Sequence, residues 1–157
     1  MQKVVQKQKA LVFTQEGYEN LQKEQAALLV KRKDVIETLK KAREMGDLSE
    51  NGLYKAARFE LGDTDRKLRR AKIMLKQATI VTKNTSDSVG IGSVVSISVD
   101  GKEYAYTIVG DFEADPGNKK ISQNSPIGRA LMGRKVGDRI SFSAPSGNIV
   151  YTLLKIS

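Results

Sequence analysis

A heptad pattern covers residues 21–75 and restricts the fold of this chain more than any other feature. In the first half, one set of positions advances by alternating four and three residues: Leu21, Gln25, Leu28, Arg32, Val35, Leu39 and Ala42. In the second half, another set advances by alternating three and four residues: Tyr54, Ala57, Leu61, Thr64, Leu68, Ala71 and Leu75. We call these positions the seam. Their spacing is that of a coiled coil, and it predicts two long helices.

The segment MGDLSEN, residues 45–51, separates the two halves of the pattern. A connection this short favours two antiparallel neighbouring helices, that is, a helical hairpin. A dimeric coiled coil is the alternative, but one uninterrupted helix would suffice for it, so the glycine-containing break argues against it. Thirty helical residues at about 1.5 Å each make a rod on the order of 45 Å long. Thr14 is the predicted N-cap of the first helix, with Glu16 in its first turn.

The chain changes character near residue 79, because short alternating runs rich in Gly, Ser, Val and Ile follow. Asp100-Gly101 predicts a tight hairpin between two strands. Ser125 and Pro126 predict the N-cap and first residue of one short helix. The predicted fold class is therefore α+β, a helical hairpin followed by a β-sheet domain with one short helix. The predicted divisions are a flexible basic tail (1–12), the hairpin (13–79), a linker (80–92) and the sheet domain (93–157).

Composition narrows the chemistry that this chain can perform. Because it contains neither cysteine nor histidine, thiolate nucleophiles, disulfides and the commonest metal ligand and general base are all absent. The net charge is +9, and residues 1–78 hold 18 Lys and Arg against 11 Asp and Glu. Such an excess indicates a polyanionic partner, nucleic acid first, or simply a well-solvated surface. With no apolar run of about 18 residues, we expect a cytoplasmic protein without a membrane partner.

Two carboxylates, Asp47 and Glu50, lie three residues apart at the predicted tip of the hairpin. On one interpretation they form a capping box that starts the second helix. On the other, they bind a hard cation such as Mg²⁺, which prefers carboxylates and water. Two exposed carboxylates hold such an ion weakly, so the remaining ligands would have to come from another molecule.

A basic run, RKLRRAKIMLK at residues 66–76, lies far from the tip in the second predicted helix. It contains six Lys and Arg and no acidic residue. One interpretation is a solvated flank of the coiled coil; the other is a stripe that contacts phosphates without regard to sequence.

Two motifs together resemble the bacterial Gre transcript-cleavage factors, with greater similarity to GreA than to GreB. AR-x-x-GDLSEN is present at residues 42–51, and I-S-x-x-SPI-x-RAL-x-G-x-x-VGD runs from Ile121 to Asp138. They occur in the family's order, and the resemblance extends from Phe13 to the end of the chain. The resemblance implies an N-terminal antiparallel coiled coil and a C-terminal FKBP-like domain that docks on RNA polymerase.

The resemblance also implies an activity and assigns residues to it. Gre factors insert the coiled coil into the polymerase's secondary channel and stimulate cleavage of the 3′ end of backtracked RNA. Asp47 and Glu50 would be the tip acids that share Mg²⁺ with the polymerase active site, without a tightly bound cofactor of their own. Ser49 and Asn51 would support the tip, and Ser125 and Pro126 would belong to the docking surface on the polymerase. The candidate contacts to nascent RNA or the channel wall are Arg58, Arg66, Arg69 and Arg70.

We thus expect a monomeric accessory factor of bacterial RNA polymerase, not an enzyme in its own right. Its partners would be the polymerase and the 3′ end of the nascent RNA. One alternative is an inhibitor with the same fold that occupies the secondary channel, because Leu53 stands where the family often has a further acid. Two others are a general nucleic-acid-binding protein and, by fold analogy alone, a prolyl isomerase.

Overall fold

The computed structural model describes residues 10–46, 48, 50–82, 87–145 and 147–157. The chain divides into two compact units. The helical unit comprises residues 18–77, and the sheet unit combines residues 10–17 with residues 78–157. The structure therefore assigns the first residues of the predicted hairpin domain to the sheet unit. Residues 1–9 of the predicted basic tail lie outside the described residues.

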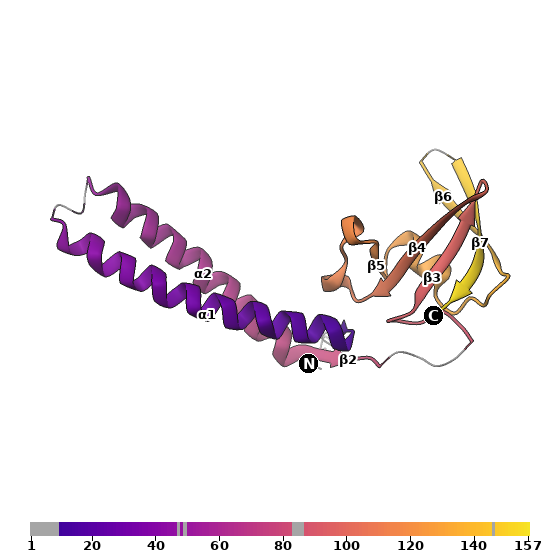
Figure 1. Ribbon diagram of the computed structural model, residues 1–157, viewed down its shortest axis with the longest axis horizontal. Helices are drawn as coiled ribbons and strands as arrows, with labels where there is room; N and C mark the ends of the chain where they lie inside the picture. Colours follow the sequence, from indigo (N-terminus) through magenta and orange to yellow (C-terminus); the bar gives the residue numbers. More distant parts are fainter. Residues whose placement is uncertain (1–9, 47, 49, 83–86, 146) are drawn as a thin grey trace, which may run out of the picture. The chain divides into compact units, whose positions relative to one another are not determined.

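The helical unit consists of two long helices that lie side by side (Figure 1). They are α1 (Gln15–Glu44) and α2 (Gly52–Gln77), so the predicted antiparallel hairpin is confirmed. Every seam position is buried or half-buried. The residues that recur every seventh position in α2 are small and almost fully buried: Ala57, Thr64 and Ala71. Small side chains at these positions let the two helices approach closely along the seam.

Two polar seam residues, Arg32 and Thr64, have partners within the hairpin. Arg32 of α1 forms an ion pair with Asp65 of α2, with 2.6 Å between Nε and Oδ1. The buried hydroxyl of Thr64 donates to the carbonyl oxygen of Glu60 at 2.8 Å. Hydrogen bonding thus offsets the cost of placing polar groups at the interface between the helices. In the described part of the chain, no helix is both long enough and apolar enough to span a membrane.

A five-stranded mixed sheet forms most of the sheet unit, in the order β5-β4-β3-β7-β6. Its strands are β3 (Val94–Val99), β4 (Lys102–Val109), β5 (Lys120–Ser122), β6 (Arg139–Ala144) and β7 (Gly147–Ile156). Strands β4 and β5 are parallel, and the other neighbours are antiparallel. A cluster of buried apolar side chains forms the core: Val89, Val95, Ile97, Ile108, Leu131, Ile140 and Leu153. The predicted α+β class is confirmed.

Local signals in the second half of the sequence give the expected turns. Asp100 and Gly101 both have positive φ, 49° and 76°, as a tight turn between β3 and β4 requires. The short helix is α3 (Pro126–Leu131), and Ser125 caps it by accepting from the Gly128 amide. Gly133, with φ of 75°, follows the end of α3.

The sheet unit departs from the predictions in two places. Strand β1 (Leu11–Phe13), which precedes α1 in the chain, pairs in parallel with β2 (Ala78–Ile80), which follows α2. This pairing was not predicted. The predicted linker, 80–92, also differs from expectation. Its residues Val89 and Ile91 are only 2% and 8% exposed. The end of the predicted linker is therefore a buried part of the sheet unit. Residues 83–86 lie outside the described residues.

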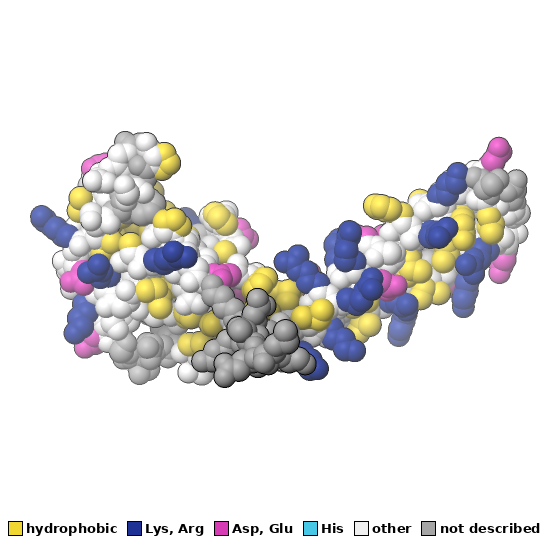
Figure 2. All heavy atoms as spheres, turned by 180° about the vertical axis from the view of Figure 1, so that it is seen from behind, with side chains coloured by type: hydrophobic (Ala, Val, Ile, Leu, Met, Phe, Trp, Pro, Cys, Tyr) yellow, Lys and Arg dark blue, Asp and Glu magenta, His cyan; other side chains and the backbone are white. Residues whose placement is uncertain are grey.

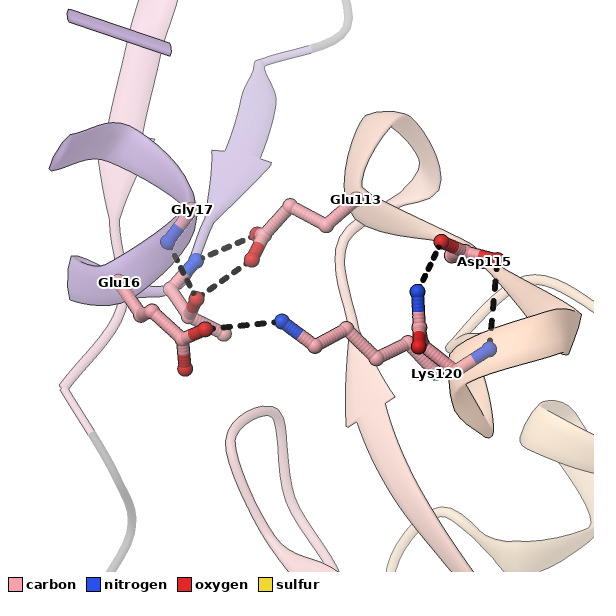
Figure 3. A network of polar contacts seen from close by, with 7 residues as sticks. Glu16, Gly17, Glu113, Asp115 and Lys120 are labelled. Carbon is pink, nitrogen blue, oxygen red and sulfur yellow. Dashed lines mark hydrogen bonds and ion pairs between the residues drawn. The ribbon is translucent and has the colours of Figure 1, made fainter. Parts of the chain in front are cut away.

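A residue that is distant in sequence completes the N-terminal cap of α1. As predicted, Thr14 is its N-cap, and the Oγ1 atom accepts from the Gly17 amide at 3.0 Å. The backbone amide of Thr14 in turn donates to Oε1 of Glu113 at 2.7 Å, and the Thr14 hydroxyl donates to Oε2. In an ordinary capping box, a Glu at the third helical position of the same helix accepts from the cap amide. Here that position is Gly17, and Glu113 supplies the carboxylate (Figure 3).

Two further contacts within the sheet unit surround this cap, and the lack of a side chain at Gly17 makes room for it. Lys120 forms an ion pair with Glu16 at 2.9 Å (Figure 3). The rings of Phe13 and Phe112 stack with 6.2 Å between their centroids. A Cβ on Gly17 would lie 2.0 Å from Oε2 of Glu113, so the absence of a side chain there leaves room for the carboxylate. We call the Thr14, Gly17 and Glu113 arrangement the distant cap.

Substitution of Glu113 tests the distant cap. We expect Glu113→Ala to lower the free energy of unfolding of the full chain by about 1–2 kcal/mol, because the Thr14 amide and hydroxyl both lose their acceptor. Glu103→Ala removes an exposed carboxylate from β4 and should change stability by less than about 0.5 kcal/mol. Urea unfolding followed by circular dichroism measures both variants.

Gly17→Ala gives a sharper test, because its effect should change sign. With Glu113 present, the added methyl group displaces the carboxylate, and the variant should be destabilised. In a Glu113→Ala background, alanine should instead stabilise the helix by up to about 1 kcal/mol relative to glycine. Equal effects of Gly17→Ala in the two backgrounds would contradict the distant cap.

Candidate functional site

The tip of the hairpin connects the end of α1 to the start of α2. Of the predicted tip residues, Glu50 and Asn51 are described, whereas Asp47 and Ser49 lie outside the described residues. Gly46 has φ of 106°, a conformation that favours glycine and allows the chain to leave α1. The tip also exposes the apolar side chain of Met45, which is 71% accessible.

Asn51 holds the two ends of the tip together. Its Nδ2 donates to the carbonyl oxygen of Ala42, near the end of α1, at 2.7 Å. Its Oδ1 accepts from the amide of Tyr54, in the first turn of α2, at 3.0 Å. One amide side chain therefore adds a second donor to a carbonyl in the last turn of α1, which also accepts from the Met45 amide at 3.3 Å, and supplies an acceptor to an amide in the first turn of α2. The Arg43 guanidinium lies 5.8 Å from the centroid of the Tyr54 ring and adds a second link between the helices.

The predicted capping box at the tip is wrong. It required Asp47 as the N-cap of the second helix, but α2 begins at Gly52 and Asn51 is its cap. Asparagine is as favourable an N-cap as aspartate. Its side chain also carries the Nδ2 donor, whose hydrogen bond the Ala42 carbonyl oxygen accepts. This position for the cap leaves the Glu50 carboxylate outside α2.

Glu50 is exposed on the turn that Asn51 holds. Within the described residues, no three acidic side chains come close enough together to hold a metal ion. A carboxylate and water suit Mg²⁺ chemically, so Glu50 is of the right type to contribute one ligand. A complete coordination sphere would require further ligands from a second molecule.

The predicted docking residues begin α3 in the sheet unit, whereas the tip is part of the helical unit. The Ser125 hydroxyl accepts from the Gly128 amide and donates to the Ser122 carbonyl oxygen at 2.7 Å. Pro126 is exposed at the first position of the helix. Asp111 fixes the preceding loop by accepting from the Asn124 side chain at 2.8 Å and from the Ser122 hydroxyl. The loop and the start of α3 thus form a hydrogen-bonded surface that presents Pro126.

The candidate RNA-contacting arginines have different surroundings along α2. Arg66 is paired with Asp63, and hydrogen bonds from Lys67 and Arg66 lower the pKa of the Asp63 carboxyl. Arg58, Arg69 and Arg70 are exposed, and none has an ion-pair partner among the described residues. Figure 2 shows Lys and Arg side chains along the helical hairpin, with apolar groups between them. The exposed, unpaired arginines are the ones best able to contact a phosphate.

Two functional features escaped the sequence analysis. The dual role of Asn51 is one; the signal that could have found it is an Asn directly before a helix-favouring run. The other is a groove between α1 and α2, to which Arg32 and Lys72 contribute. The polar seam positions were visible in the sequence, but they indicated only an irregular coiled coil.

Comparison with known families matches both parts of the chain. Residues 11–80 match the model described as "Transcription elongation factor, N-terminal". Residues 83–157 match the model described as "Transcription elongation factor, GreA/GreB, C-term". The two matches together span nearly all of the described residues.

Individual relatives agree with the family matches over almost their whole lengths. The chain is 40% identical over 154 residues to transcription elongation factor GreA of Bacillus velezensis, covering 96% of this chain and 98% of that protein. It is 42% identical over 153 residues to GreA of Thermoanaerobacter pseudethanolicus, covering 94% and 98%. Among solved structures, GreA factor homolog 1 of Thermus thermophilus matches with a TM-score of 0.46 and 25% identity, covering 95% and 99%.

Substitutions at Asn51 test its bridging role. We expect Asn51→Ala to lower the free energy of unfolding by about 1–2 kcal/mol, because both an N-cap acceptor and a carbonyl partner are lost. Asn51→Asp retains the acceptor for Tyr54 and should restore part of that loss. Thermal unfolding followed by circular dichroism measures the effect, with the exposed Lys55→Ala as control. An unchanged stability in Asn51→Ala would contradict the role.

Proposed function

This chain belongs to the GreA/GreB family of transcription elongation factors, and we propose that it stimulates RNA polymerase to cleave the 3′ end of backtracked RNA. The observation that supports this most directly is the exposed Glu50 carboxylate at the end of a long hairpin. A slender pair of helices suits delivery of a side chain into a deep channel. The proposed partner is bacterial RNA polymerase, and the hairpin is proposed to enter it through the secondary channel.

Pre-organisation of the tip supports a role for Glu50 in the polymerase active site. Asn51 bonds to both helices, so the residue next to Glu50 has a fixed backbone position. A carboxylate on such a turn loses little conformational freedom when it meets its target. Asp47, three residues earlier in the sequence, is proposed as the second acid.

Mg²⁺ is the proposed shared ion, with Asp47 and Glu50 as this chain's ligands and the polymerase's carboxylates as the others. When bound there, Mg²⁺ supplies an activated water and stabilises the charge that develops during an in-line displacement. Glu50 and Asp47 would orient that water and accept hydrogen bonds from it. On this proposal the catalytic centre belongs to the polymerase, and the chain itself is an accessory factor.

The remaining predicted residues have proposed roles in placing the tip. Ser125 shapes the surface that presents Pro126, and this surface is the proposed docking site on the polymerase. The exposed Arg58 and Arg70 are proposed to contact nascent RNA or the channel wall, in a manner weakened by salt. Arg66, which pairs with Asp63, would contribute less.

The inhibitor alternative rests on Leu53, which is 46% exposed in the first turn of α2. An apolar side chain there leaves the tip less negative than an acid would. A factor with a weakened tip would still occupy the channel and block nucleotide addition. Cleavage and blocking are separable in one assay, so the same experiment decides between the two functions.

A stalled, backtracked elongation complex with 5′-labelled RNA provides the test. We expect the wild-type chain to shorten the RNA at least about tenfold faster than polymerase alone. Asp47→Asn/Glu50→Gln should bind polymerase with unchanged affinity but lose most of this stimulation, because the amides are poor ligands for Mg²⁺.

The matched control is Glu24→Gln/Asp34→Asn, which removes two exposed acids from the body of α1 and should cleave like wild type. If wild type binds and blocks nucleotide addition without cleavage, the inhibitor alternative is correct. If both double variants lose cleavage equally, net charge rather than the tip acids determines activity.

A further inference from the structure

A groove of about 550 Å³ lies between the two long helices of the helical unit. We call it the arm groove. Its volume falls within the range of small-molecule sites, about 300–1,000 Å³. Its lining residues come from both helices: Gln25, Leu29, Arg32, Asp65, Leu68, Arg69 and Lys72.

The arm groove lies where the seam is least apolar. Gln25 and Arg32 are the two polar positions in the α1 half of the seam, and both line the groove. A polar residue at such a position lowers the stability of a coiled coil. The sequence therefore keeps two stability-lowering residues where the helices form a hollow, which suits a binding function.

The charges of the arm groove favour an anion. Three cationic side chains line it, Arg32, Arg69 and Lys72, against the single carboxylate of Asp65. Asp65 pairs with Arg32. Arg69 Nε lies 3.4 Å from the backbone oxygen of Asp65, and in the described part of the chain neither Arg69 nor Lys72 has an ion-pair partner. Two cations one turn apart on α2 can therefore contact neighbouring phosphates.

The rest of the lining suits an organic group attached to those phosphates. Leu29, which is 51% exposed, and the half-buried Leu68 provide apolar surface. The Gln25 amide offers both a donor and an acceptor, as the edge of a nucleobase requires. An apolar surface with a few polar groups and adjoining cations matches a nucleotide better than it matches a simple anion.

We propose that the arm groove binds a free nucleoside di- or triphosphate. Arg69 and Lys72 contact the phosphates, Leu29 and Leu68 contact the base or ribose, and Gln25 bonds to the base edge. The lining residues nearest the tip, Arg32 and Asp65, form an ion pair across the helices, so a compact ligand fits better than a continuous nucleic-acid strand. This function is separate from the tip and from polymerase, and would let the factor respond to nucleotide supply.

Isothermal titration calorimetry of the full chain, without polymerase, tests the proposal. The probes are ATP, GTP and ADP, with adenosine and inorganic pyrophosphate as fragments. We expect saturable binding at one site, tighter for triphosphates than for ADP, and at least about tenfold weaker for either fragment. Arg69→Gln/Lys72→Gln should weaken ATP binding at least about tenfold, because both charge-assisted hydrogen bonds to the phosphates are lost.

Two further variants separate the groove from general charge. Lys33→Gln/Lys40→Gln removes two exposed cations of α1 that lie outside the lining and should bind ATP within about twofold of wild type. Leu29→Ser keeps the charge and should weaken ATP binding several-fold, but leave pyrophosphate binding unchanged. Circular dichroism confirms that each variant remains helical.

Several results would overturn the proposal. Absence of saturable nucleotide binding at millimolar concentration excludes the site. Equal losses in the two double variants indicate attraction by net charge alone. Pyrophosphate binding as tight as that of ATP excludes a nucleoside contact. If a short single-stranded RNA binds while free nucleotides do not, the groove is an RNA surface.

Discussion

The hydrogen bonds between Glu113 and Thr14 determine where the first long helix can begin. Thr14 caps α1 through its hydroxyl, but its own backbone amide requires an acceptor that the first turn does not supply. Glu113 provides that acceptor across 99 residues of sequence. The strand β1, the first turn of α1 and the sheet are consequently one compact unit. The start of α1 depends on a carboxylate that exists in place only when the sheet unit is folded.

The sequence predicts those parts of the structure that local patterns determine. The seam, the Asp100-Gly101 turn and the Ser125 cap all depend on residues within a few positions of one another, and the structure confirms them. The distant cap was not predictable, because no local pattern around Glu113 indicates a hydrogen bond to Thr14. The parallel pairing of β1 with β2 is similar: each has three residues, and their partners are 67 positions apart. In strands this short, the alternation of apolar and polar residues is too brief to predict a strand or its partner.

At the tip, the spacing of two acidic residues predicted a helix cap that the structure assigns to a neighbouring residue. Asp47 and Glu50 match a capping box in spacing, yet the cap is Asn51. The spacing rule fails here because the Asn51 side chain donates to a carbonyl of α1 and accepts from an amide of α2 at once, whereas an ionised aspartate can only accept. The candidate metal ligands remain predicted from the family motif, since only Glu50 of the pair is described. The arm groove lay beyond prediction for another reason: a hollow arises from the sizes of side chains on two helices together.

The distant cap also has a consequence for the order in which the molecule is assembled. A ribosome releases the N-terminal residues first, and contacts close in sequence form fastest. The hairpin can therefore zip along its seam while Glu113 is still to be synthesised. Thr14 is synthesised 99 residues before Glu113, so its backbone amide receives this acceptor only after the intervening chain has been made. A chain that stops before Glu113 therefore retains an N-terminus of α1 whose Thr14 amide lacks this acceptor.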